Sequence, residues 1–214
     1  MKLLKCILPF LFICLLFILT GLFLVLITDK GTLHLSINTL VGGPMDDFFK
    51  YFTHIGDGIT VAALIVLSSL TVKGKIIPYI LLGLSSFALS GLLTQLLKRL
   101  VFNGYSRPLK FFGPENLNLI EGVKLHGSYS FPSGHSTASF ALFIFLAFVF
   151  RKTKYAQVFF GILAILAAYS RVHISQHFVQ DIICGATIGV SIFFFTFWLM
   201  NKYIFKTTFK AISD

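Results

Sequence analysis

The sequence contains few charged residues, and acidic side chains are the scarcest of them. Only 12% of its 214 residues are charged and 8 are Asp or Glu, whereas 56% are hydrophobic. This balance argues against an aqueous domain and indicates a membrane protein. The 18 Lys and Arg residues give a net charge of +10, but they lie in short clusters rather than in one solvated block. Nucleic-acid binding is therefore not expected.

Cysteine is also scarce. Cys6, Cys14 and Cys184 all lie in apolar segments without the spacing of metal ligands, so they offer neither a disulfide framework nor a metal site. The first apolar run is longer than a signal-peptide core and lacks a small-residue cleavage site. We interpret it as an uncleaved membrane span.

Six apolar runs follow one another, and no strand-like alternation competes with them, so each is expected to be a helix with internally satisfied backbone groups. The first, third and sixth are long enough to cross a ~30 Å hydrocarbon core, and the others need tilt or flanking residues. The sequence therefore predicts an all-α, polytopic membrane protein, one domain of residues 1–214 built as a six-transmembrane-helix bundle. The runs are roughly 6–28, 58–72, 76–97, 133–150, 155–171 and 180–200.

Two further segments have recognisable patterns. Residues 29–57 mix phenylalanines with acidic residues and are broken at Gly42-Gly43-Pro44, which predicts one or two interfacial amphipathic helices. Gly185 and Gly189 form a small-xxx-small pattern that favours close helix packing.

The orientation of the bundle follows from its basic residues. With six spans, ten of them fall on the side that also holds both termini, and by the positive-inside rule that side is cytoplasmic. The loop 98–132 and the turn 172–179 then lie on the extracytoplasmic face of a bacterial inner (plasma) membrane. The ten residues are Lys2, Lys5, Lys73, Lys75, Arg151, Lys152, Lys154, Lys202, Lys206 and Lys210.

A dense polar cluster lies between Ser170 and Asp181. Ionisable side chains near membrane spans are costly and are usually functional. His177 and Asp181 are four residues apart, so on a helix they share one face and can hydrogen-bond. A carboxylate beside an imidazole fixes its tautomer and makes the opposite nitrogen a better nucleophile. Arg171 adds a cation that suits bidentate phosphate contact.

A second histidine, His135, follows Pro132-Ser133-Gly134. We expect this segment to open the fourth helix, with proline in its first turn and with free amides that attract an anion. Gly134 allows close approach of an oxygen to the backbone. Lys98 and Arg107 supply further cations on the same membrane side. Together these residues predict a two-histidine site for phosphoryl transfer.

On these motifs the sequence resembles the type-2 phosphatidic acid phosphatase superfamily, which also contains vanadium haloperoxidases. The family's signature is a Lys and Arg-Pro block, then Pro-Ser-Gly-His, then Ser-Arg followed by five residues, His, three residues and Asp; the last two blocks match without a gap. The first block departs, because eight residues separate Lys98 from Arg107, two more than is usual. Arg99 is therefore an alternative to Lys98. The motif-bearing core spans residues 98–181.

The resemblance implies a role for each matching residue. His177 would attack phosphorus to form a phosphohistidine, with Asp181 orienting it. His135 would protonate the leaving oxygen and later activate water. The phosphate would be held without a metal or cofactor by Lys98, Arg107, Ser133, Gly134 and Arg171.

The function expected from this resemblance is a metal-independent lipid phosphate or diphosphate phosphatase of the extracytoplasmic leaflet. Its partners would be a lipid phosphate substrate and membrane lipids. Candidate substrates are undecaprenyl diphosphate, phosphatidylglycerol phosphate, phosphatidic acid and lipid A, with undecaprenyl diphosphate as the first guess. Oligomeric state is not indicated.

Several alternatives stay open. A lipid phosphotransferase would differ only in its acceptor. A transporter would place its charges near the bilayer midplane, whereas these cluster at one surface. A zinc site would use His173 with His177 but lacks evident further ligands, and otherwise His173 would be a supporting or lipid-headgroup contact. His34, His54 and His126 carry no motif and are expected at surface or interfacial positions, although His126 could touch substrate.

Overall fold

The computed structural model describes residues 5–205, and every regular element in that range is a helix. This confirms the all-α prediction. Lys2, Lys206 and Lys210, on which the orientation argument partly relies, lie outside the described residues.

Each of the six predicted apolar runs forms a helix at the expected place. Four of these helices, α2, α6, α9 and α10, are long and apolar enough to cross a membrane, and α6 is counted here with the π turn that follows it. A bent pair, formed by residues Pro44–Gly56 and by α5, can add a fifth span. The chain is thus a multi-pass membrane protein, while a count of six spans stays a prediction. The six helices are α2 (Leu8–Ile27), α5 (Gly58–Ser69), α6 (Ile76–Leu96), α8 (Gly134–Val149), α9 (Lys154–His173) and α10 (Val179–Tyr203).

Helix α8 is the centre of the bundle. Every residue from Ser136 to Phe148 is buried, and α5, α6, α9 and α10 all pack against it. Along this stretch the 16-residue α8 is therefore enclosed by protein and has no lipid-facing surface.

The predicted close packing at Gly185 and Gly189 is confirmed. A Cβ atom at Gly185 would lie 2.6 Å from the carbonyl oxygen of Ser133, and one at Gly189 would lie 2.6 Å from that of Thr137. Helices α8 and α10 therefore approach so closely that no side chain fits between them at these two positions.

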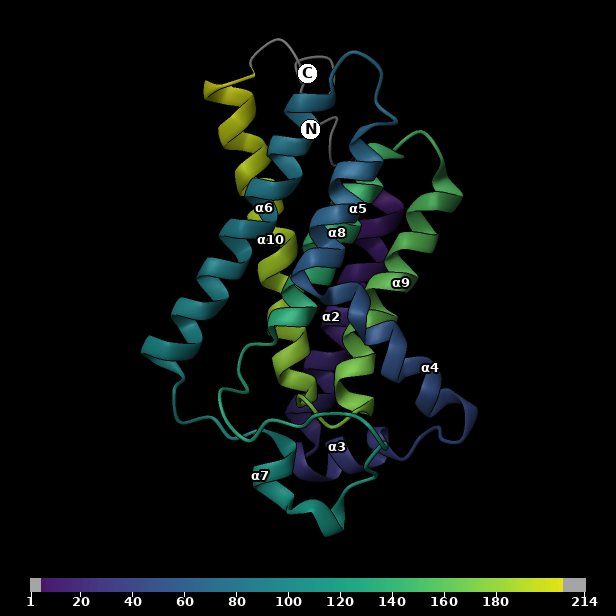
Figure 1. Cartoon of the computed structure of the whole chain (residues 1–214), viewed down its shortest axis with the longest axis vertical. Coiled ribbons are helices and arrows are strands. Elements are labelled where there is room, and N and C mark those ends of the chain that lie inside the picture. The colour runs from purple at the N-terminus through teal and green to yellow at the C-terminus, as the bar shows by residue number, and fades with distance from the viewer. Residues whose placement is uncertain (1–4, 206–214) are drawn as a thin grey trace.

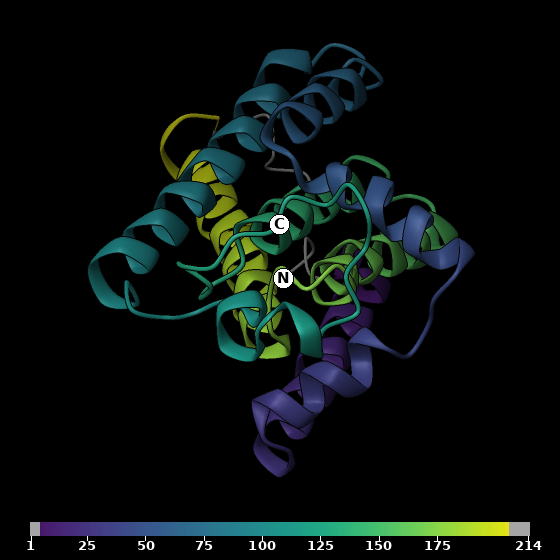
Figure 2. The same cartoon turned by 60° about the horizontal axis from the view of Figure 1, so that its bottom comes forward.

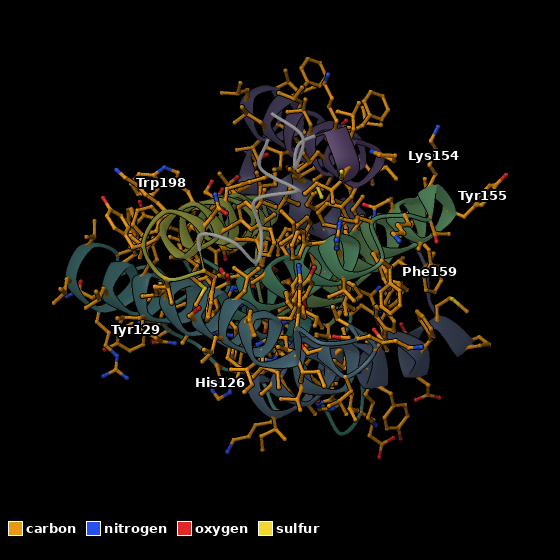
Figure 3. All side chains as sticks on the ribbon, turned by 90° about the horizontal axis from the view of Figure 1, so that it is seen from above. His126, Tyr129, Lys154, Tyr155, Phe159 and Trp198 are labelled. Atoms are coloured by element: carbon orange, nitrogen blue, oxygen red, sulfur yellow. The ribbon has the colours of Figure 1, made fainter. Side chains whose placement is uncertain are left out.

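The outer surface of the bundle is apolar and aromatic. Figure 3 shows Tyr155, Phe159 and Trp198 projecting away from the helices, and their side chains are 87%, 56% and 51% exposed. Exposed residues of this type suit contact with lipid, with Tyr and Trp favoured at the membrane interface.

The two ends of the bundle differ. The start of α2, the end of α10 and the turns that join α5 to α6 and α8 to α9 lie at the upper end in Figure 1. The lower end carries α3 (Lys30–Asn38), α7 (Pro108–Phe112), a single turn η3 (Pro114–Asn116) and the turn between α9 and α10. Figure 2 brings this end forward and shows the chain between α6 and α8 running across it.

Where one or two helices were predicted, residues 29–57 form two, α3 and α4 (Pro44–Phe52), and α4 begins directly after the predicted break at Gly42-Gly43. Helix α4 continues through a single 3-10 turn, η1 (Thr53–Gly56), and meets α5 at a bend of 67°. This segment packs against α9 and α8, so it is part of the helical bundle as well as a segment at its end.

Candidate active site

The turn between α9 and α10 presents His177. The backbone amides of Gln176 and His177 both donate to the carbonyl of Arg171, at 2.9 and 3.0 Å, and so close the turn. His177 is buried, and its Nδ1 lies 3.2 Å from Oδ2 of Asp181 in the first turn of α10. The predicted pair is therefore present, but His177 precedes α10 and does not share a helix face with Asp181.

Asp181 is itself held in place by two further donors. Its Oδ2 accepts hydrogen bonds from Ser130 Oγ at 2.5 Å and from the backbone amide of Phe178 at 3.0 Å. Because this oxygen is an acceptor for all its partners, we assign the proton of His177 to Nδ1. The lone pair of Nε2 is then free to act as a nucleophile.

The surroundings of His177 keep its imidazole neutral. Burial, followed by the positive charges of Arg107 and Lys98, holds the pKa of His177 well below its usual value. Arg171 and His135 contribute in the same direction, which shows that the predicted groups converge on this ring. A neutral imidazole is the form that can attack phosphorus.

The start of α8 faces the same region. Ser133 caps the helix, its Oγ accepting from the Ser136 amide at 3.3 Å, and its own amide donates to the Asp181 carbonyl at 3.0 Å. Apart from its chain neighbours and its own helix backbone, no described atom would lie within 4 Å of a Cβ added to Gly134, so there is room beside this first helical residue. The prediction that Pro132 belongs to the first turn is wrong, because Pro132 precedes the cap.

Three cations lie at the ends of the helices. Lys98 and Arg171 are each 6% exposed. Lys98 Nζ donates to the Tyr129 carbonyl at 2.9 Å, and Arg107 Nη1 donates to Gln176 Oε1 at 2.7 Å. Burying several cations close together costs free energy unless each is paired with an anion. The arrangement therefore favours binding of an anionic ligand.

Arg171 retains unused hydrogen-bonding capacity. Its Nη1 donates to Thr53 Oγ1 at 2.6 Å, while its buried Nε has no partner anywhere in residues 5–205. A buried donor without a partner costs about 1–3 kcal/mol, and an oxygen of a bound phosphate would supply one.

The structure distinguishes Lys98 from Arg99. Lys98 is buried and electrostatically coupled to Arg107, Asp181 and Arg171, whereas Arg99 is exposed. The segment between Lys98 and Arg107, which is longer than in the family's signature, begins where α6 ends in a π turn, η2 (Leu97–Val101). The Phe102 amide closes this turn by donating to the Leu97 carbonyl. A π turn takes up more residues than an α turn.

Beside these cations lies a basic cavity of about 350 Å³. Lys98 and Arg107 line it together with Arg99 and His126. Burial, followed by the charge of Arg107, lowers the pKa of His126. Within the described chain no acidic side chain lines this cavity, so its charge suits an anion.

A separate, apolar groove of about 570 Å³ lies between α2, the α3–α4 segment and α9. Phe49, Tyr169 and Val172 line it on the side towards the polar cluster. It has the chemistry of a hydrocarbon-binding surface.

Three residues of the segment 44–57 support the site although they belong to no recognised motif. Asp46 Oδ1 is 2.8 Å from Nε2 of His173, Thr53 accepts from Arg171, and Asp57 Oδ1 is 2.7 Å from Nε2 of His135. The sequence offers a signal for Asp46 and Asp57, because acidic residues next to membrane helices are rare and are usually functional.

Two expectations about the other histidines need correction. His173 is fully buried and bonded to Asp46, so it does not contact lipid headgroups. His34 is not at a surface, since it is fully buried between the rings of Phe112 and Phe178. His54 is 62% exposed, as expected, but it is paired with Asp57. Within residues 5–205 no three His, Cys, Asp or Glu side chains gather as metal ligands would.

Comparison with known proteins agrees with these motifs. Residues 79–205, more than half of the chain, match the profile of the PAP2 superfamily. The chain is 33% identical over 120 residues to the lipid A 4'-phosphatase of Bacteroides thetaiotaomicron, covering 52% of this chain and 51% of that protein. It is 35% identical over 75 residues to phosphatidylglycerophosphatase B of Bacillus subtilis, covering 31% and 37%. The chain thus spans about half the length, or less, of these curated relatives.

Two solved structures share the fold. LpxE of Aquifex aeolicus superposes with a TM-score of 0.67 at 24% identity, covering 80% of this chain and 96% of that one. The phosphatidylglycerolphosphate phosphatase of Bacillus subtilis gives 0.63 at 24% identity, covering 94% and 97%. At this level of identity the likeness concerns the fold alone.

Proposed function

The chain belongs to the PAP2 superfamily, and on that premise we propose that it is a membrane phosphatase that hydrolyses lipid phosphates through a phosphohistidine intermediate. The single observation that carries this proposal is the convergence of Lys98, Arg107 and Arg171 on the neutral, Asp181-bound imidazole of His177. Such an arrangement pairs a nucleophile with cations for the equatorial oxygens of a phosphoryl group.

The reaction has two steps. In the first, Nε2 of His177 attacks phosphorus, the bond from phosphorus to the lipid oxygen breaks, and protonated His135 gives that oxygen a proton. In the second, neutral His135 takes a proton from water, the water oxygen attacks phosphorus, and the bond to His177 breaks. Lys98, Arg107, Arg171 and the amides at Ser133–Gly134 hold the phosphoryl oxygens throughout.

The position of the site favours a phosphatase over a transporter. Lys98 lies in the turn that ends α6, and Arg171 lies in the last turn of α9, so the buried charges are gathered at one end of the bundle and not at mid-span. A phosphate at headgroup depth would reach them while its acyl chains stay in the bilayer. The apolar groove along α2 and α9 offers those chains a surface.

The names of the relatives suggest lipid A and phosphatidylglycerol phosphate as substrates, and undecaprenyl diphosphate and phosphatidic acid complete the set to be tested. We expect the purified protein to release phosphate from at least one of these lipids in detergent, with activity retained in excess EDTA and inhibited by orthovanadate. Three cationic side chains and a helix N-terminus can neutralise phosphate without a metal. Loss of activity in EDTA that zinc or magnesium restores would contradict this mechanism, and transfer of phosphate to a second lipid would indicate a phosphotransferase.

We further propose that the site faces the extracytoplasmic side, because Lys5, Lys73, Lys75, Arg151 and Lys152 lie at the opposite end of the bundle. A cysteine replacing exposed Glu121 should react with a membrane-impermeant thiol reagent in intact cells or spheroplasts. A cysteine replacing exposed Lys152 should react only after lysis. Labelling in the reverse order would invert the orientation and place the reaction in the cytoplasmic leaflet.

A further inference from the structure

Asp57 lies between two histidines at the junction of η1 and α5. Its Oδ1 is 2.7 Å from Nε2 of His135, and its Oδ2 is 2.7 Å from Nδ1 of His54. Asp57 and His135 are 78 residues apart in the chain, so the contact is made by the fold and not by a local motif.

The contact is not a by-product of helix capping. Asp57 occupies the N-cap position of α5, where an Asp side chain ordinarily accepts from an amide of the first turn. Within the described chain it makes no such bond, and both of its oxygens are directed at imidazoles.

The backbone is also arranged to bring Asp57 close to His135. A Cβ added to the neighbouring Gly56 would lie 2.8 Å from Ser139 Oγ and 3.0 Å from the His135 carbonyl oxygen. The turn η1 therefore rests directly on the beginning of α8, and only glycine permits this approach.

We propose that Asp57 is a positioning residue for His135, acting in the proposed phosphatase reaction as Asp181 acts for His177. This inference rests on the proposed function. With Nε2 of His135 bonded to Asp57, the imidazole presents Nδ1 to the substrate. His54, which is bonded to the other oxygen, fixes the rotation of the carboxylate.

The carboxylate has a defined part in each step. When His135 is doubly protonated, Nε2–H donates to Asp57 and the Nδ1 proton passes to the leaving oxygen as its bond to phosphorus breaks. The ring is then neutral and keeps the Nε2 proton, so Nδ1 can take a proton from the attacking water. Asp57 does not change its own protonation state, and it favours the imidazolium over the neutral ring.

This role predicts an effect that depends on the leaving group. Asp57→Asn should lower kcat/KM for a short-chain phosphatidic acid by about 10²-fold, because an alkoxide needs a proton as it leaves. The same variant should change kcat/KM for 4-nitrophenyl phosphate by less than about threefold, because nitrophenolate leaves without an acid. The parameter kcat/KM is the right one, since it does not include hydrolysis of the phosphoenzyme.

Matched variants separate positioning from a structural role. Asp46→Asn removes the other acidic partner of a histidine in the same segment, and it should leave the ratio of the two kcat/KM values unchanged. Gly56→Ala keeps the carboxylate but displaces it, and it should reproduce the selective loss. In a His135→Ala background, Asp57→Asn should have little further effect, because both groups act as one unit.

The outcomes are distinguishable. Equal losses on both substrates in Asp57→Asn would overturn the inference, and a melting temperature in detergent well below that of the wild-type protein would then make Asp57 structural. Wild-type kcat/KM on both substrates would overturn it as well. A wild-type protein that cleaves neither ester nor any lipid phosphate would instead overturn the proposed function, and the inference with it.

Discussion

Replacing His177 with Ala should lower phosphate release from the best lipid substrate by at least about 10³-fold, because no covalent route to product then exists. His177 is buried, so loss of its ring could also cost stability. His177→Gln, which keeps more of the volume, should be equally inactive. Both variants should extract from membranes and elute from a sizing column as the wild-type protein does.

A trapping experiment assigns the covalent step to this residue. With 4-nitrophenyl phosphate as substrate, His135→Ala should accumulate an alkali-stable, acid-labile phosphoenzyme, since the departing phenolate needs no acid but the second step lacks its base. His177→Ala should form none. Phosphoenzyme in a folded His177→Ala variant would assign the nucleophile to another side chain, and near-normal turnover would remove His177 from the mechanism.

The second large effect is expected at a residue that carries no side chain. Gly185→Ala should lower kcat by about 10²-fold, because misplacing catalytic groups by ~1 Å costs that much. The added methyl group would lie 2.6 Å from the Ser133 carbonyl and 3.1 Å from the Thr137 amide, so α8 must move away from α10. That movement separates His135 on α8 from His177 beside α10.

Gly91 in α6 provides the matched control, because outside its chain neighbours and its own helix backbone no described atom would lie within 4 Å of a Cβ added there. Gly91→Ala should keep full activity and melt at the same or a slightly higher temperature, since Ala is the better helix former. A Gly185→Ala variant as active as Gly91→Ala would show that the approach of α8 to α10 does not set the geometry of the site.

The helices and the two motif blocks could be predicted because their signals are local. Each apolar run became a helix within a few residues of its expected bounds, since a backbone in lipid must satisfy its own hydrogen bonds. The four-residue spacing predicts the pairing of His177 with Asp181, although in the structure His177 lies in the turn just before α10. That Lys98 is buried while Arg99 is exposed came only from the structure, where both lie in the π turn η2.

The segment 44–57 marks the limit of local patterns. Its phenylalanines and acidic residues indicate an amphipathic helix, and α4 is one, but that pattern does not show which helix the segment packs against. Asp46, Thr53 and Asp57 find their partners on α9 and α8. These contacts depend on how α4, η1 and α5 bend around the bundle, and no spacing in the sequence encodes that bend.

The sequence by itself determined a helical membrane protein with two histidine blocks, because hydrophobic run length and residue spacing act within one element. The tertiary structure alone decided that α8 is the enclosed central helix, that Arg171 rests on Thr53, and that Asp57 meets His135. Contacts of this second kind join residues tens of positions apart. Glycines at positions 56, 185 and 189 let neighbouring backbones approach closely, and such an approach is a property of packed helices in space.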